Sequence, residues 1–223
     1  MPTLTRDADV YVLDLGADEN RFNAQSLDAI EACLAEVERA PPPRALVTAA
    51  TGKFWSNGLD LEWMATLGEA AVPFVARVHE LLARVLALNV PSVAALQGHT
   101  FAAGAMLALA HDQRLMRSDR GFFCLPEVDI NIPFTPGMSA LIAARLPTQT
   151  AHEAMTTGRR YGGVDAAGAG IVRAAVPDSE VLSRAIELAA GSAAKNPDTL
   201  GAIKQRLHEK TLTTLRAPHA PES

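Results

Sequence analysis

Two turns in the sequence place backbone amide donors at the starts of helices. In residues 54–63 (FWSNGLDLEW) a tight Ser-Asn-Gly turn comes directly before a helical pattern, so the amides of Gly58 and Leu59 lie at an unpaired helix start. Residues 97–106 (QGHTFAAGAM) repeat this arrangement after a buried strand and place the amides of Ala103 and Gly104 at a second helix start. Either turn alone is typical of an ordinary strand-to-helix connection. If both face one cleft, they form a pair of N–H donors suited to an oxyanion.

The third candidate is a carboxylate in an apolar segment. Glu127 lies within residues 121–134 (GFFCLPEVDINIPF), where phenylalanine, leucine and isoleucine dominate. Apolar neighbours disfavour the charged form of a carboxyl group and raise its pKa toward the range useful to a general base. On its own, a glutamate in this position is equally compatible with a surface loop.

Three other motifs in the sequence do not fit the functional sites that they superficially suggest. The glycines at 168–170 close a helical pattern and precede a strand, which is the wrong order for a dinucleotide-binding turn. Ser139 lacks the second glycine of a nucleophile elbow. The pairs at 111–112 and 152–153 do not have the i, i+4 histidine spacing of a metal site on a helix. Dinucleotide binding, serine hydrolysis and metal catalysis are therefore disfavoured, and we expect no metal.

Alternating strand and helix patterns position these segments. Apolar runs predict strands at 10–15, 44–50, 92–98, 114–118 and 171–176. Helical periodicity predicts helices from a cap at Ser26 to residue 40, after Asp60, and at 70–89, 103–110, 137–145, 149–157 and 179–194, with a loop at 52–58 and a turn at 164–170. This order indicates an α/β fold with parallel strands. We expect one domain overall, with a core at 1–195 and a short C-terminal helical extension at 196–223.

Length and charge exclude several classes. The 223 residues are 48% hydrophobic and 20% charged, which is typical of a folded globular domain. The net charge of −5 argues against a general nucleic-acid or membrane binder. Two cysteines without CxxC spacing exclude a disulfide framework and indicate a reducing compartment. With no signal peptide, membrane span or targeting motif in the sequence, we expect a cytoplasmic location.

Three blocks of the sequence occur in the same order as three blocks of a known family and resemble them. Residues 54–61, 98–104 and 125–130 are similar to the three blocks of the crotonase superfamily, the enoyl-CoA hydratase/isomerases, and the similarity extends over about residues 8–190. The second and third blocks look most like the Δ3,Δ2-enoyl-CoA isomerases of the plant peroxisomal type. The resemblance implies a ClpP/crotonase spiral of ββα units.

The resemblance also implies roles for individual residues. An acyl-CoA thioester would be held with its carbonyl oxygen between the backbone N–H groups of Leu59 and Ala103, with no cofactor beyond the coenzyme A of the substrate. Ala103 stands where many family members have glycine. Glu127 would be the catalytic carboxylate. The expected substrate-binding residues are Phe54, Trp55, Ser56, Asn57, Gly58 and Met106.

One position distinguishes two reactions. Hydratases of the family carry two glutamates that hold and activate water, and the first of them corresponds to Met106 here. A single carboxylate, Glu127, suits the transfer of a proton from C2 to C4, which converts a 3-enoyl-CoA into the trans-2-enoyl-CoA of fatty acid oxidation. The alternatives are a hydratase-like enzyme with another acyl-CoA specificity and a non-catalytic acyl-CoA binding protein on the same fold.

The sequence also predicts the oligomeric state and a role for the basic C-terminal helix. The helices at 137–157 and 178–195 carry more alanine, leucine and isoleucine than one layer over a sheet covers, and the resemblance implies trimers. We therefore expect a homotrimer or a dimer of trimers. The basic C-terminal helix, with Lys204, Arg206 and Lys210, is expected to meet the phosphates of CoA, although a charge run of this kind is more often a solvated face.

Overall fold

A six-stranded sheet organises the computed structural model, which describes residues 1–218. Its strands, in spatial order, are β1 (Thr3–Asp7), β2 (Val10–Asp14), β3 (Ala45–Ala49), β5 (Ser92–Leu96), β7 (Gln113–Arg117) and β9 (Ala174–Val176). Strand β1 pairs antiparallel to β2, and all later pairs are parallel. Because each new parallel strand is added at the same edge, the chain winds in one direction as it builds the sheet.

A second, smaller sheet lies beside the first. It consists of three parallel strands, β4 (Phe54–Ser56), β6 (His99–Phe101) and β8 (Phe123–Cys124), in that order. Each follows a strand of the large sheet and leads toward a helix, so that the units β3-β4, β5-β6 and β7-β8 repeat one pattern. The spiral of ββα units that the resemblance implies is therefore present.

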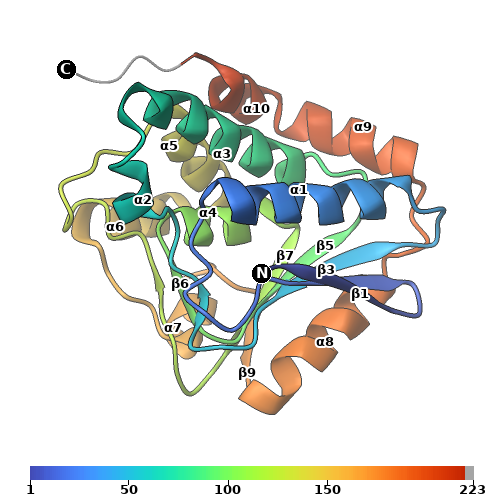
Figure 1. Ribbon diagram of the computed structural model, residues 1–223. Coiled ribbons are helices and arrows are strands. Elements are labelled where there is room, and N and C mark those ends of the chain that lie inside the picture. Colours follow the sequence, from blue (N-terminus) through green and yellow to red (C-terminus); the bar gives the residue numbers. More distant parts are fainter. Residues whose placement is uncertain (219–223) are drawn as a thin grey trace.

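Helices cover both faces of the large sheet (Figure 1). Helix α8 (Asp178–Ala190) packs on one face and buries small aliphatic side chains of β2, β3, β5 and β7. The other face is covered by α1 (Ala24–Arg39), α3 (Ala71–Leu86) and α4 (Ala103–Ala110), which enclose the main core. The remaining helices are α2 (Leu61–Met64), the 3₁₀ turn η1 (Gly68–Ala70), α5 (Pro136–Arg145), α6 (Thr148–Thr157), α7 (Gly163–Gly168), α9 (Pro197–Leu207) and α10 (Glu209–Arg216).

Helix α1 shows how local sequence fixes an element. The Asn23 side chain accepts a hydrogen bond from the amide of Ser26, and the Ser26 hydroxyl accepts one from the amide of Asn23, which completes a capping box. Asn23, rather than the expected Ser26, is therefore the N-cap. The helix buries the predicted face of Leu27, Ile30, Leu34 and Val37 and ends before the prolines at 41–43.

Some predicted elements differ from the structure. The loop expected at 52–58 contains β4, and the turn expected at 164–170 is largely helix α7. Strand β9 occupies only the second half of the segment 171–176. The structure contains the two C-terminal helices α9 and α10, of which α10 packs on α3 and α5; the extension predicted to 223 continues beyond the described residues.

Candidate active site

The first amide donor is set by a bridge between Phe22 and Leu59. The amide of Phe22 donates to the Gly58 carbonyl at 2.7 Å, and the amide of Asp60 donates to the Phe22 carbonyl at 3.0 Å. In this parallel arrangement the groups on either side of Leu59 face Phe22, so the Leu59 N–H faces the opposite side. That N–H has no protein acceptor among the described residues and lies at the wall of a pocket.

The second donor is the first residue of α4. Ala103 occupies N1, where a helix amide has no intrahelical acceptor, and the described residues supply no other. The preceding residue, Ala102, has φ 49° and ψ −127°, a conformation that favours glycine. Ala103 itself is free of this strain, so its N–H is presented as the resemblance implies.

Gly58 brings the two donors together. It has φ +78°, and a Cβ added there would lie 2.9 Å from the Ala103 nitrogen. The turn before Leu59 therefore lies directly against the turn before Ala103. A side chain at position 58 would push these turns apart, which explains why the close approach requires glycine.

Glu127 faces the same pocket from the loop after β8. Its side chain is buried, with the residue 6% exposed, and the Oε2 atom has no hydrogen-bond partner. Burial raises the pKa of Glu127 to about 7, because removal from water disfavours the carboxylate. A carboxyl group of this kind exchanges protons readily near neutral pH.

The pocket has a volume of about 480 Å³. Its lining residues Arg21, Asn57 and Glu62 are grouped by ion pairs and a hydrogen bond to Glu19, and we call this group the polar end; most of the other lining side chains are methionine, leucine, isoleucine, valine, alanine and proline. The full lining is Arg21, Asn57, Leu59, Leu61, Glu62, Met64, Val75, Phe101, Ala102, Ala103, Met106, Pro126, Glu127, Ile130, Ile132, Pro133, Thr135 and Met138. The pocket thus combines two amide donors, a buried carboxyl group whose Oε2 atom has no partner, and many apolar side chains.

The residues expected to bind substrate separate into two groups. Asn57 and Met106 line the pocket, but the other four do not. Trp55 is fully buried and donates from Nε1 to the Thr48 carbonyl at 3.2 Å, so it belongs to the core. Ser56 is also fully buried.

Ser56 and Phe54 make contacts within the protein near the turn that precedes Leu59. The Ser56 hydroxyl donates to the Asn20 carbonyl at 2.8 Å and accepts from the Gly58 amide at 3.2 Å. Phe54 lies 5.3 Å from the His99 ring, centroid to centroid, on the small sheet. Trp55 and Ser56 are fully buried, Gly58 is buried and Phe54 is partly buried, so none of the four lines this pocket; substrate contact by them stays a prediction.

Sequence reasoning missed several pocket residues. Met64, Val75 and Met138 come from three different helices, and each belongs to an ordinary apolar pattern in the sequence. Arg21 precedes α1 in a polar segment that carried no distinguishing motif. Only their convergence in space identifies them, and a single sequence contains no signal for it.

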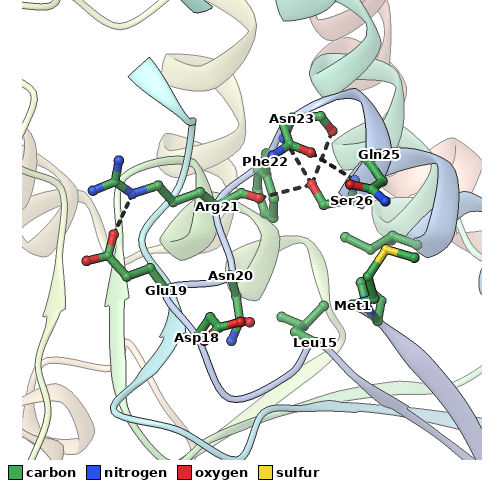
Figure 2. Close-up of a pocket in the computed structure, with 12 residues that line it drawn as sticks. Met1, Leu15, Asp18, Glu19, Asn20, Arg21, Phe22, Asn23, Gln25 and Ser26 are labelled. Carbon is green, nitrogen blue, oxygen red and sulfur yellow. Dashed lines mark hydrogen bonds and ion pairs between the residues drawn. The ribbon is translucent and has the colours of Figure 1, made fainter. Parts of the chain in front are cut away.

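A second cavity, of about 330 Å³, adjoins the polar end of the pocket through Arg21, which lines both. In Figure 2 the Arg21 side chain points away from Met1 and Gln25 and pairs with Glu19. The Glu19 carboxylate also accepts from the Asn57 side chain at 3.3 Å. The polar end of the pocket is thus held by a small charged network.

The basic C-terminal helices do not present all their charges to solvent. Lys204 is 5% exposed, and its Nζ donates to the Asp112 carboxylate at 2.7 Å and to the Val90 carbonyl at 3.1 Å. The expectation that Lys204 meets CoA phosphates is therefore wrong, since its ammonium group is already used. Arg206 and Lys210 are exposed.

Within residues 1–218, no group of three or more His, Cys, Asp or Glu side chains is arranged to hold a metal ion. Within the same residues, no helix has the length and apolar character needed to cross a membrane.

Comparisons with known proteins agree with this geometry. Enoyl-CoA delta isomerase 3 of Arabidopsis thaliana is 35% identical over 222 residues, covering 93% of this chain and 92% of that protein. The peroxisomal enoyl-CoA delta isomerase 2 of the same plant is 37% identical, with 87% and 86% covered. The apo structure of an enoyl-CoA isomerase from Mycobacterium tuberculosis superposes with a TM-score of 0.90 at 26% identity and covers 97% of this chain and 95% of that one.

The family model described as enoyl-CoA hydratase/isomerase matches residues 7–222, which is nearly the whole chain. Leu59, Ala103 and Glu127 line one pocket, and the ββα spiral agrees with the fold that the resemblance predicts. The chain therefore belongs to the enoyl-CoA hydratase/isomerase family.

Proposed function

We propose that this protein isomerises 3-enoyl-CoA thioesters to trans-2-enoyl-CoA, a reaction of fatty acid oxidation. The observation that carries the proposal is the chemistry of the pocket: one buried carboxyl group at Glu127, whose Oε2 atom has no hydrogen-bond partner, with Met106 in place of a second acid. The other carboxylate at this pocket, Glu62, has a side chain that is 90% exposed at the polar end. The names of the two plant relatives support the same activity.

In the proposed mechanism Glu127 acts as a single proton shuttle. The carboxylate removes a proton from C2, and the electron pair of the broken C–H bond spreads over C3, C4 and the thioester carbonyl as a dienolate. The same carboxyl group then returns the proton at C4, which leaves the double bond between C2 and C3. No water is consumed, in keeping with an apolar thioether beside the base.

The amides of Leu59 and Ala103 are proposed to stabilise the dienolate. Its negative charge collects on the thioester oxygen, and preorganised N–H donors stabilise such a charge more than they stabilise the neutral carbonyl. By analogy with removal of one oxyanion-hole donor in other enzymes, each amide contributes about 3 kcal/mol. The CoA portion would leave the pocket at its polar end, past Asn57 and Arg21.

The decisive assay supplies 3-hexenoyl-CoA and crotonyl-CoA to the parent protein and to Glu127→Gln. We expect the parent to isomerise the first substrate and to hydrate the second poorly. Glu127→Gln should retain thioester binding and lose about 10²–10⁴-fold in turnover. Efficient hydration without isomerisation by the parent would refute the proposed reaction, and undiminished isomerisation by Glu127→Gln would remove Glu127 from the mechanism.

A further inference from the structure

The helix that carries the Ala103 amide has no polar side chain. All eight residues of α4 are buried alanine, glycine, methionine or leucine. No side-chain hydrogen bond from α4 itself therefore fixes the helix along its axis. Apart from the packing of its buried side chains, the axial position of α4, and with it the position of the Ala103 N–H, depends on hydrogen bonds at the ends of the helix.

The backbone joins the N-terminal end to the small sheet. The Ala102 amide donates to the Cys124 carbonyl at 3.1 Å, and no side chain caps the helix there. The Ala102 carbonyl accepts from the Met106 amide, which is a contact within the helix itself. Side chains hold the other end, around residues 109–112.

Two guanidinium groups hold that end. Arg145, the last residue of α5, donates from Nε to the Leu109 carbonyl at 2.8 Å and from Nη2 to the carbonyls of His111 at 2.7 Å and Asp112 at 3.1 Å. Arg114 in β7 donates to the His111 carbonyl at 3.0 Å and reaches the Leu109 carbonyl at 3.4 Å. Its Nε donates to the Ile171 carbonyl at 2.7 Å.

Three positively charged side chains, those of Arg114, Arg145 and Lys204, lie close together near the C-terminal end of α4. Arg114 is 8% exposed and Lys204 is 5% exposed, and both lie beside Arg145, whereas Asp112 is the one carboxylate within residues 1–218 that contacts this group. Burial lowers the pKa of Arg114 to about 9. Cations are unfavourable in such a place unless strong partners face them, and the carbonyls at a helix C-terminus carry the required partial negative charge.

We propose that Arg114 and Arg145 are positioning residues for the oxyanion hole. By holding the carbonyls at the C-terminus of α4, they fix how far the helix extends toward Leu59, and hence where the Ala103 N–H lies. Their positive charges, aligned with the helix, also favour negative charge at its N-terminal end. This inference rests on the proposed function, because it assigns the Ala103 amide to the thioester oxygen.

Arg145 provides the cleaner test, because it is half-buried and ends a helix. Arg145→Met keeps an aliphatic side chain of similar length but removes the guanidinium N–H donors. Arg145→Lys keeps the charge but replaces a planar fork with a single donor group. The matched control is Arg184→Met, which removes an exposed arginine of α8 that pairs only with Glu180 and Glu187.

Two readouts are required. The first is steady-state kinetics with 3-hexenoyl-CoA: kcat should fall about 10-fold to 100-fold in Arg145→Met with KM changed less than about 3-fold, and Arg145→Lys should be intermediate. The second is the infrared C=O stretch of bound butyryl-CoA labelled with ¹³C at the thioester carbon. An oxyanion hole lowers this frequency, and the lowering should be smaller in Arg145→Met and unchanged in Arg184→Met.

The infrared readout separates the two proposals, because butyryl-CoA undergoes no reaction. A parent protein that polarises the bound carbonyl but does not isomerise 3-hexenoyl-CoA would refute the proposed function and leave the positioning role testable. Folded Arg145→Met with unchanged kcat per folded molecule and an unchanged C=O frequency would overturn the inference. If Arg145→Met does not fold, the same two measurements on Arg145→Lys decide the question.

Discussion

The stability of this protein should depend on pH through Glu127. The carboxyl group is buried without a partner for Oε2, and burial raises its pKa from the ordinary 4.5 to about 7. At 1.36 kcal/mol per pKa unit, ionising Glu127 in the folded protein is about 3 kcal/mol harder than in the unfolded chain. This penalty is the consequence of keeping a base in an apolar pocket.

The direction of this pH dependence follows from whether the folded or the unfolded protein keeps the Glu127 proton. Between pH 4.5 and about 7 the unfolded chain has lost the Glu127 proton and the folded protein retains it. Stability therefore falls as the pH rises through this range and is constant above it, as far as Glu127 is concerned. Glu127→Gln removes the dependence. Its stability relative to the parent should increase by about 3 kcal/mol from pH 4.5 to pH 8.

Urea unfolding of both proteins at several pH values between 4.5 and 8 measures this difference. Any fixed cost of burying the amide shifts the difference equally at every pH, so the change with pH isolates the ionisation of Glu127. The control is Glu62→Gln, because that carboxylate is 90% exposed at the same pocket and changes little in hydration on unfolding. A difference between Glu127→Gln and the parent that is the same at pH 5 and pH 8 would refute the reasoning.

Four further outcomes are expected. Met106→Glu should introduce measurable hydration of crotonyl-CoA, at the cost of placing a second acid in the pocket of Glu127; no gain in hydration would remove Met106 as the determinant. Ala102→Gly should stabilise the protein by about 1 kcal/mol in thermal unfolding by relieving the strained φ, whereas Ala108→Gly within α4 should destabilise it. Lys204→Ala should destabilise the fold by about 2 kcal/mol because the Asp112 carboxylate and the Val90 carbonyl lose a charged donor, while Arg206→Ala should change stability by less than about 0.5 kcal/mol. Light scattering at micromolar concentration should find a trimer or hexamer, and a monomer would contradict the proposed assembly.

The large elements of the fold follow from the sequence because their patterns are long. Helix α4 has the predicted bounds, and α1 buries the predicted face, since a helix of this length repeats its apolar period several times. Strand β1 was missed because TLTRD is mostly exposed and lacks an apolar run. The strands of the small sheet have two or three residues, which is too short for a period to be recognised.

In the candidate site, too, some residues were predictable from the local sequence and others were not. The two turns and the apolar neighbourhood of Glu127 are local properties of the sequence and predicted the three segments of the site, whereas the choice of the Leu59 and Ala103 amides within the turns came from the family resemblance. The position of Trp55 in the core and the contacts of Arg145 were not predictable, because both depend on segments far away in the chain, at Thr48 and at 109–112. Long-range packing decided whether a residue faces the pocket.

The small sheet explains why three distant residues converge. Strands β4, β6 and β8 are parallel neighbours, so their C-terminal ends lie along one edge. Leu59 follows β4, Ala103 follows β6 and Glu127 follows β8, each two or three residues beyond the end of its strand. Each ββα unit therefore contributes one group to the pocket at an equivalent place. The separation of these groups depends on strand spacing, which is nearly constant at about 4.8 Å, and on the length of each short connection. Inserting one residue between Cys124 and Pro126 should consequently abolish turnover while leaving the large sheet intact, because it displaces Glu127 without touching either amide. Circular dichroism and thioester binding report the intact fold, and retained isomerisation would contradict this account of the site.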